Sequence, residues 1–267
     1  MSATVLVTGS AQAKQVTPSA PAPSTTAMVT FSARAKPVSP RTTVLCKAYQ
    51  HITVTHAGRQ YVVRNDNYGR QPECLRNQNG GTNFAIVSSG ARVRRDEPVA
   101  YPNIFVGCSW GICTAHSGLP LRVSRIKSVV STWHTRMRSA GAWSAGYDIW
   151  FDRKPSKSGQ SGGAELMIWL NARGFGQDTA PEVTIDGRRW RLEHWVTSGH
   201  GKHWNYIQFR KVGGTSKVTN LNVKPFIALA EHLRYIQPQW WLTSVMAGFE
   251  IWRGGVGLRT TNFVVRL

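Results

Sequence analysis

A short apolar run at residues 164–170, Ala-Glu-Leu-Met-Ile-Trp-Leu, constrains the fold more than any other segment of the sequence. Glycines precede it and an asparagine follows it, and a run of this length between turn residues predicts a β-strand. Because side chains alternate across a strand, the even-numbered residues form an apolar face that suits a core. The opposite face carries Glu165, Met167 and Trp169. Burying a carboxylate there is costly unless the group is paired or used, so we expect the chemistry here.

The rest of the chain repeats this pattern of short apolar or alternating segments separated by turn residues. Further strands are expected at 52–55, 61–64, 83–87, 101–107, 123–133, 142–151, 183–185, 190–192, 204–209, 242–252 and 260–265. Asp186-Gly187 suits the tight turn of a hairpin. Only Pro225–Ile236 predicts a helix, because its apolar residues recur at helical spacing after a proline. Many short strands with one helix predict an all-β fold, either a sandwich or a jelly roll.

The first 42 residues differ from the rest in composition. They are rich in Ala, Ser, Thr and Pro and contain no acidic residue. Such a segment cannot bury enough apolar surface to offset its ordering, so we expect residues 1–42 to be disordered and the domain to span 43–267. The first ten residues lack the basic start and the apolar run of a signal peptide, and no stretch has transmembrane length.

Four cysteines, Cys46, Cys74, Cys108 and Cys113, allow three pairings. We prefer Cys46 with Cys74, which ties the start of the domain to a distant loop, and Cys108 with Cys113, which closes a tight turn. A zinc site is the alternative, but the Cys-x4-Cys spacing has no second pair to complete it. Disulfides imply an oxidising compartment, so secretion is expected although no signal peptide is legible.

The chain carries 33 Lys and Arg against 13 Asp and Glu, a formal net charge of +20. Such an excess brings nucleic acid or an anionic surface into consideration as a partner. The bases are scattered, with no run of five or more, which favours solvation over specific nucleic-acid binding. Attachment to an anionic cell surface is another interpretation of the excess.

Three acidic residues in strand-like segments have an aromatic or thioether side chain two residues further on. They are Asp148 with Trp150, Glu165 with Met167, and Glu250 with Trp252. Aromatic faces stack against sugar rings, and glycoside hydrolysis needs one ionised and one protonated carboxyl group. The alternative, buried ion pairs with arginine, would explain any one of the acids. Three acids with similar neighbours favour a sugar-cleaving cleft.

These motifs resemble glycoside hydrolase family 12, the family of β-1,4-endoglucanases and xyloglucanases. The resemblance spans about residue 45 to the C-terminus and rests on Tyr147–Trp150, Ala164–Trp169 and Gly248–Trp252, in the family's order. The two cysteine pairs are similar to the arrangement in bacterial members. The resemblance implies a β-jelly roll of two curved antiparallel sheets, whose concave sheet forms an open glucan-binding groove. It implies no metal and no cofactor.

The resemblance also implies a retaining mechanism, with Glu165 as nucleophile and Glu250 as acid/base, ~5–5.5 Å apart. Asp148 would hydrogen-bond the nucleophile. The expected substrate-binding residues are Asn65, Tyr68, Trp110, Trp150, Met167 and Trp169. The expected partner is a polysaccharide substrate, a β-1,4-glucan or a xyloglucan. The protein is expected to act as a monomer and to bind no nucleic acid.

One run departs from the family pattern. The usual Asn-Asn-x-Trp-Gly reads Asn-Asp-Asn-Tyr-Gly at 65–69, so stacking of a glycone-side sugar would fall to Tyr68. Two other functions are compatible with parts of the sequence. A metal site built from Glu193, His194, His200 and His203 is less favoured, because such groups across a hairpin are usually solvated. A catalytically silent basic jelly roll that binds glycan or polyanion is less favoured because both Glu165 and Glu250 are present.

Overall fold

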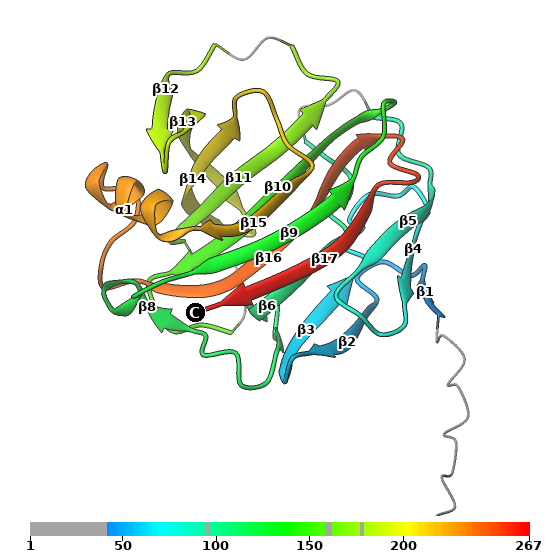
Figure 1. Cartoon of the computed structure of the whole chain (residues 1–267), viewed down its shortest axis with the longest axis horizontal. Coiled ribbons are helices and arrows are strands. Elements are labelled where there is room, and N and C mark those ends of the chain that lie inside the picture. The colour runs from blue at the N-terminus through cyan, green and yellow to red at the C-terminus, as the bar shows by residue number, and fades with distance from the viewer. Residues whose placement is uncertain (1–41, 94–96, 158–161, 177–178) are drawn as a thin grey trace, which may run out of the picture. The chain divides into compact units, whose positions relative to one another are not determined.

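Two β-sheets make up the fold (Figure 1). The computed structural model describes residues 42–93, 97–157, 162–176 and 179–267, which belong to the compact unit Ser39–Leu267. The six-stranded sheet contains, in spatial order, β1 (Thr42–Leu45), β4 (Glu73–Gln78), β5 (Phe84–Ser89), β17 (Arg259–Arg266), β9 (Val130–Arg136) and β15 (Lys217–Asn222). The predicted disordered segment, residues 1–42, lies outside the described residues except for Thr42.

The second sheet has eleven strands. Its path runs through β12 (Glu182–Ile185), β13 (Arg188–Gly199), β14 (Lys202–Lys211), β11 (Ala164–Arg173), β10 (Ala142–Asp152), β16 (Trp241–Arg253), β6 (Asn103–Ser109), β3 (Arg59–Arg64) and β2 (His51–His56). Two short strands lie off this path, β7 (Ile112–Cys113) beside β6 and β8 (Leu121–Arg122) beside β16. The all-β jelly roll with a single α-helix among the described residues is therefore confirmed.

The core lies between the sheets, because alternate side chains of each strand point inward. In β11, Leu166, Ile168 and Leu170 are fully buried in the main apolar cluster. Met167 and Trp169 belong to a different cluster on the other face of the strand. The alternation predicted for residues 164–170 is confirmed, and the odd-numbered residues of β11 face away from the main core.

Two hairpins follow directly from their turn residues. Ala57 and Gly58 between β2 and β3 have φ angles of 48° and 76°, and Asp186 and Gly187 between β12 and β13 have 48° and 68°. Two successive positive φ angles are typical of the type I′ turn, whose twist matches that of the flanking strands. The Asp-Gly hairpin predicted from the sequence is therefore present.

Two predicted elements are shorter than expected. The strand expected at 123–133 begins only at Val130, because residues 123–125 form a 3₁₀ turn, η1, that buries Val123 and Ile126 at three-residue spacing. The helix expected to reach Ile236 is α1 (Lys224–His232). The chain leaves the helix through Arg234, whose φ of 64° is the left-handed conformation that ends many helices.

The larger sheet is not wholly antiparallel, contrary to expectation. β14 runs parallel to β11, with Glu165 opposite Tyr206 and Met167 opposite Gln208. The reason is that β12 and β13 intervene in the chain, so β14 pairs antiparallel with β13 and parallel with β11. Strands β1, β4 and β15 were not predicted, since their sequences are short or polar.

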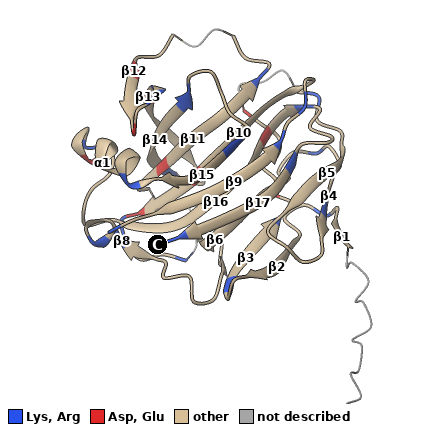
Figure 2. Cartoon of the chain, in the orientation of Figure 1, with Lys and Arg blue, Asp and Glu red and all other residues tan. Residues whose placement is uncertain are grey.

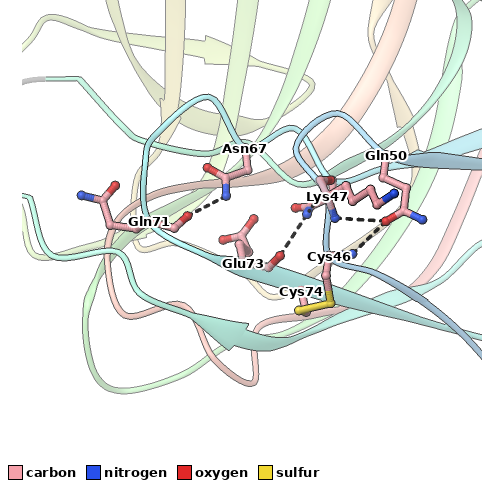
Figure 3. The surroundings of a disulfide bond; sticks show 8 residues. Cys46, Lys47, Gln50, Asn67, Gln71, Glu73 and Cys74 are labelled. Carbon is pink, nitrogen blue, oxygen red and sulfur yellow. Dashed lines mark hydrogen bonds between the residues drawn. A yellow bond between two sulfur atoms is a disulfide. The ribbon is translucent and has the colours of Figure 1, made fainter.

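Both preferred disulfides are present, Cys46–Cys74 and Cys108–Cys113. The first joins the residue after β1 to β4 beside a layer of polar side chains (Figure 3). There the Gln50 side-chain oxygen accepts hydrogen bonds from the backbone N–H groups of Cys46 and Lys47. The second closes the turn between β6 and β7. No helix within the described ranges has the length and hydropathy needed to span a bilayer.

The two disulfides should contribute unequally to stability. Their sequence separations are 28 and 5 residues, and a longer closed loop removes more entropy from the unfolded chain. Replacing Cys46 and Cys74 by Ser should lower the free energy of unfolding by about 3–4 kcal/mol, against about 2 kcal/mol for Cys108 and Cys113. Urea denaturation followed by circular dichroism measures both losses, and equal losses would contradict the loop-entropy explanation.

Candidate active site

The three predicted acids lie on one face of three neighbouring strands, β11, β10 and β16. Asp148 of β10 is in register with Met167 of β11 on one side and Met246 of β16 on the other. Glu165 is two residues from Met167 and Glu250 is four residues from Met246, so the period of two places all three acids on the same side. This side is opposite to the main core, as the sequence predicted.

Indole rings and thioethers form the floor around the acids. Trp150 packs against Trp204 with ring centroids 5.6 Å apart, in a cluster that includes Met246. Trp169 lies against β10 at Gly146, where an added Cβ would stand 2.7 Å from its ring. Trp150, Met167 and Trp169 are each at most 6% exposed, so they offer a substrate little more than an edge.

Glu165 accepts a hydrogen bond at Oε2 from the indole Nε1–H of Trp204, at 2.7 Å. Trp204 lies on β14, the strand that pairs parallel with β11. A hydrogen bond to a carboxylate favours its ionised form. The sequence analysis missed Trp204, because the parallel pairing of two segments separated by a hairpin leaves no local signal.

Glu250 accepts a hydrogen bond at Oε2 from the hydroxyl of Ser144, at 2.6 Å. The two residues are direct cross-strand partners on β16 and β10. The Trp169 indole and the Arg210 charge also favour the carboxylate form of Glu250. Ser144 was also missed, since a serine in a strand has no distinguishing pattern.

Burial keeps protons on this cluster at neutral pH. It raises the pKa of Asp148 and of Glu250 to about 7, and that of Glu165 well above its usual range. The charge of Asp148 raises the pKa of Glu165 further, while the Trp204 N–H lowers it. Carboxyl groups on neighbouring strands that influence one another in this way lose their protons in successive steps, so ionisation of one disfavours ionisation of the next.

The relation of Asp148 to Glu165 differs from the one that the family resemblance implied. No hydrogen bond joins these two described residues, and Oδ1 of Asp148 is buried without a partner. Each acid instead acts on its neighbours through charge. The hydrogen bond expected between Asp148 and Glu165 is therefore not among the bonds of the described residues, and the charge of Asp148 instead raises the pKa of Glu165.

Exposed aromatic rings stand beside the acids on the side of β3 and β6. Tyr68 and Trp110 are each 47% exposed and line a cavity of about 600 Å³ together with Asp66. A smaller hollow continues from Asp66 and Trp110 to Asp148. Burial of its hydroxyl end raises the pKa of Tyr68, and the charge of Glu250 raises it further, while the ring itself stays half-exposed on the cavity wall. This is the arrangement expected for a stacked sugar.

Asn65 does not face the groove, contrary to expectation. Its side chain is fully buried, and its amide donates to the backbone carbonyls of Lys47 and Glu73, the latter labelled beside the disulfide in Figure 3. The next residue, Asp66, faces the cavity instead and forms an ion pair with Arg64 at 2.6 Å. The prediction that Asn65 binds substrate is therefore wrong, because the Asn65 side chain holds this segment against Lys47 near the start of the domain and Glu73 of β4.

Aromatic rings continue on the opposite side, along β14 and β13. Tyr206 is in register with Glu165, and Trp195, 43% exposed, stacks on it at 4.3 Å between ring centroids. Nearby, Phe175 is 41% exposed and lines a cavity of about 380 Å³ with Arg210. The aromatic surface therefore extends on both sides of the acids, which suits a polymer that lies across the strands.

The candidate metal ligands have other partners. His194 stacks on Tyr235 at 3.6 Å, His200 packs edge-on against Trp110 at 5.1 Å, and Glu193 forms an ion pair with Arg210. Across the described ranges, no three His, Cys, Asp or Glu side chains converge as metal ligands.

A face that combines carboxyl groups of raised pKa with exposed aromatic rings is typical of an enzyme that hydrolyses glycosidic bonds. The sequence comparison agrees with this class. The model of glycosyl hydrolase family 12 matches residues 60–267, and the chain belongs to that family.

Individual relatives agree with the family. Endoglucanase S of Pectobacterium parmentieri is 31% identical over 172 residues, which cover 62% of this chain and 65% of that protein, just under two thirds of its length. The crystal structure of a metagenome-derived family 12 endoglucanase superposes with a TM-score of 0.77 at 38% identity, covering 85% of this chain and 98% of that one. Endoglucanase cel12A from Rhodothermus marinus gives 0.75 at 37% identity, covering 84% and 97%.

Replacing Trp204 by Phe should raise the pKa of Glu165. The change removes the N–H donor that favours the carboxylate and keeps an aromatic ring against Trp150. Titration of ¹³C-labelled glutamate side chains by NMR measures the shift. Trp190→Phe is the matched control, because Trp190 is a buried core residue whose N–H has no partner. An unchanged pKa of Glu165 in the Trp204 variant would contradict the role of this hydrogen bond.

Proposed function

We propose that the protein is a retaining, endo-acting glycoside hydrolase of β-1,4-glucan, with Glu165 as nucleophile and Glu250 as general acid and base. The observation that carries the proposal is the placement of two half-buried carboxyl groups, Glu165 and Glu250, on one aromatic-lined face, on either side of the strand that holds Asp148. The names of the relatives, endoglucanases, support the activity. The division of roles between the two acids rests on the resemblance of their motifs to the family.

In the first step, protonated Glu250 gives its proton to the glycosidic oxygen while the Glu165 carboxylate attacks the anomeric carbon. The bond to the leaving sugar breaks and a glycosyl-enzyme ester forms. The raised pKa of Glu250, about 7, supplies the proton, and the Trp204 N–H supports the ionised Glu165. A neutral Asp148 removes the repulsion that would otherwise oppose ionisation of Glu165.

In the second step, Glu250, now a carboxylate, takes a proton from a water molecule that attacks the same carbon. The ester to Glu165 breaks, and the product keeps the β configuration. The Ser144 hydroxyl stabilises the charge on Glu250 during this half of the cycle. Both steps use the same two side chains, so no metal or cofactor is required.

The substrate is proposed to be a polysaccharide because aromatic rings extend on both sides of the acids. Tyr68 and Trp110 would stack glycone-side sugars, and Trp195 would stack sugars on the other side. The two disulfides support an oxidising compartment, and we infer a secreted protein that acts as a monomer.

Chemical rescue should separate the roles of the two acids. Glu165→Ala should lower kcat by about 10⁴-fold or more, and azide should restore turnover of an activated aryl β-cellobioside with an α-glycosyl azide as product. Glu250→Ala should lower kcat by about 10²–10⁴-fold, and azide should instead give the β-glycosyl azide as product. NMR of the products reads the anomer. The opposite pattern would reverse the roles, and glucan binding by the unaltered protein without release of reducing ends would favour the silent binding module.

The alkaline limb of the pH profile should report Glu250. Because this group must be protonated to act as an acid and its pKa is about 7, kcat/KM should fall as the pH rises through this value. Ser144→Ala removes a hydrogen bond that lowers that pKa, so the limb should move to higher pH. Ser244→Ala, which deletes a buried hydroxyl without a partner, is the matched control. A limb that stays in place in the Ser144 variant would contradict the assignment of Glu250 as the acid.

A further inference from the structure

The solvent face of the six-stranded sheet carries a cross-strand row of arginines. Arg76 of β4 is in register with Ala85 of β5, Ala85 with Arg259 of β17, and Arg259 with Arg136 of β9. All three arginines are exposed. Strands lie about 4.8 Å apart, so the row crosses the sheet over roughly 15 Å. This face lies on the other side of the core from the acids.

The three arginines surround a hollow of about 170 Å³. Between them it is lined by side chains that can hydrogen-bond to hydroxyl groups, Gln78, Asn83 and Thr261. The hollow is small and open, and positive charge enters it from three different strands. It therefore suits one anionic group of an extended ligand better than an enclosed small molecule.

These charges are not neutralised within the protein. None of the three arginines forms an ion pair or a hydrogen bond with another described residue. The six strands contain a single acidic residue, Glu73, which is 2% exposed and belongs to the inner face. Figure 2 shows that basic residues outnumber acidic ones over the whole domain, with blue segments on both sheets and few red ones. Like charges directly opposite each other destabilise a sheet, so Arg136 and Arg259 carry a cost that an external anion would relieve.

We propose that this face binds an anionic polysaccharide through the carboxylates of its uronic acid units, at a site formed by Arg76, Arg136 and Arg259. Guanidinium groups bind carboxylates with two parallel hydrogen bonds, so arginines suit a carboxylate ligand better than lysines do. Lys217 of β15 lies opposite His134, two residues along β9 from Arg136, and adds a further exposed base to this face. The site would hold the enzyme on a charged matrix while the groove stays free.

The composition of this face argues against other polyanions. Single-stranded nucleic acid is held by aromatic rings that stack on bases, and membrane surfaces are held by apolar side chains that insert. The exposed aromatic residues, Tyr49, Tyr68, Trp110, Phe175 and Trp195, lie outside the six strands. Among the exposed large apolar residues only Val44 belongs to this sheet. The hydroxyl and amide groups beside the arginines suit the hydroxyls of a sugar.

The test uses the full chain and polygalacturonate, measured by biolayer interferometry at low salt. The variant R76Q/R136Q/R259Q should bind about tenfold more weakly, since three exposed ion pairs are lost. Added salt should weaken binding of the unaltered protein. Hydrolysis of a soluble neutral β-glucan should be unchanged in the variant, because the row and the groove lie on different sheets. That second measurement keeps a failure of the binding site distinct from a failure of the proposed activity.

A matched control removes the same charge elsewhere. R125Q/K127Q/R188Q alters three exposed bases outside the six-stranded sheet and should bind within twofold of the unaltered protein. Equal losses in both variants would overturn the site in favour of a general effect of net charge. Absence of binding to polygalacturonate would also overturn it, as would tighter binding of polyphosphate, single-stranded DNA or anionic lipid vesicles that depends on the same arginines.

Discussion

The desolvation of three carboxyl groups on one face is the constraint on which the groove depends. Loss of hydration raises the pKa of Asp148, Glu165 and Glu250, and the charges of Asp148 and Glu250 raise the pKa of Glu165 further. The protein offsets this cost with single, directed donors, an indole N–H for Glu165 and a hydroxyl for Glu250. Because no cation neutralises the cluster outright, it keeps at least one proton near neutral pH. That is the state which acid-assisted cleavage requires.

Strand β10 determines where these groups stand. Every residue of β10 is buried, and it is the common neighbour of β11 and β16. Glu165 and Glu250 are therefore positioned by ladders to the same strand, and not by loops. A shift of register on either side would turn one acid toward the core, where the charge could not be tolerated. The register between β10 and β11 shifts at Ala145-Gly146, and Gly146, which has no Cβ, leaves room for the ring of Trp169.

The sequence predicted those features that depend on neighbouring residues. The alternation in 164–170 was enough to assign Glu165 to the face opposite Leu166, and an Asp-Gly pair was enough to locate a hairpin. Features that depend on distant pairing were missed. Trp204 reaches Glu165 only through a parallel ladder, and Asn65 is withdrawn from the groove by contacts with Lys47 and Glu73. Neither outcome has a local pattern, because both are set by which strands become neighbours.

The large positive charge of the chain has little effect on the acids, and the sandwich explains why. Arg210 is the base that lowers the pKa of Glu250, and Arg64 the one that lowers that of Asp148. Arg210 is itself paired with Glu193 and Arg64 with Asp66, so each brings a compensating negative charge. The arginines of the six-stranded sheet are separated from the groove by the apolar core and face water, where salt screens them within about 10 Å. One sheet can therefore hold carboxyl groups with raised pKa values while the other exposes arginines, without either affecting the other.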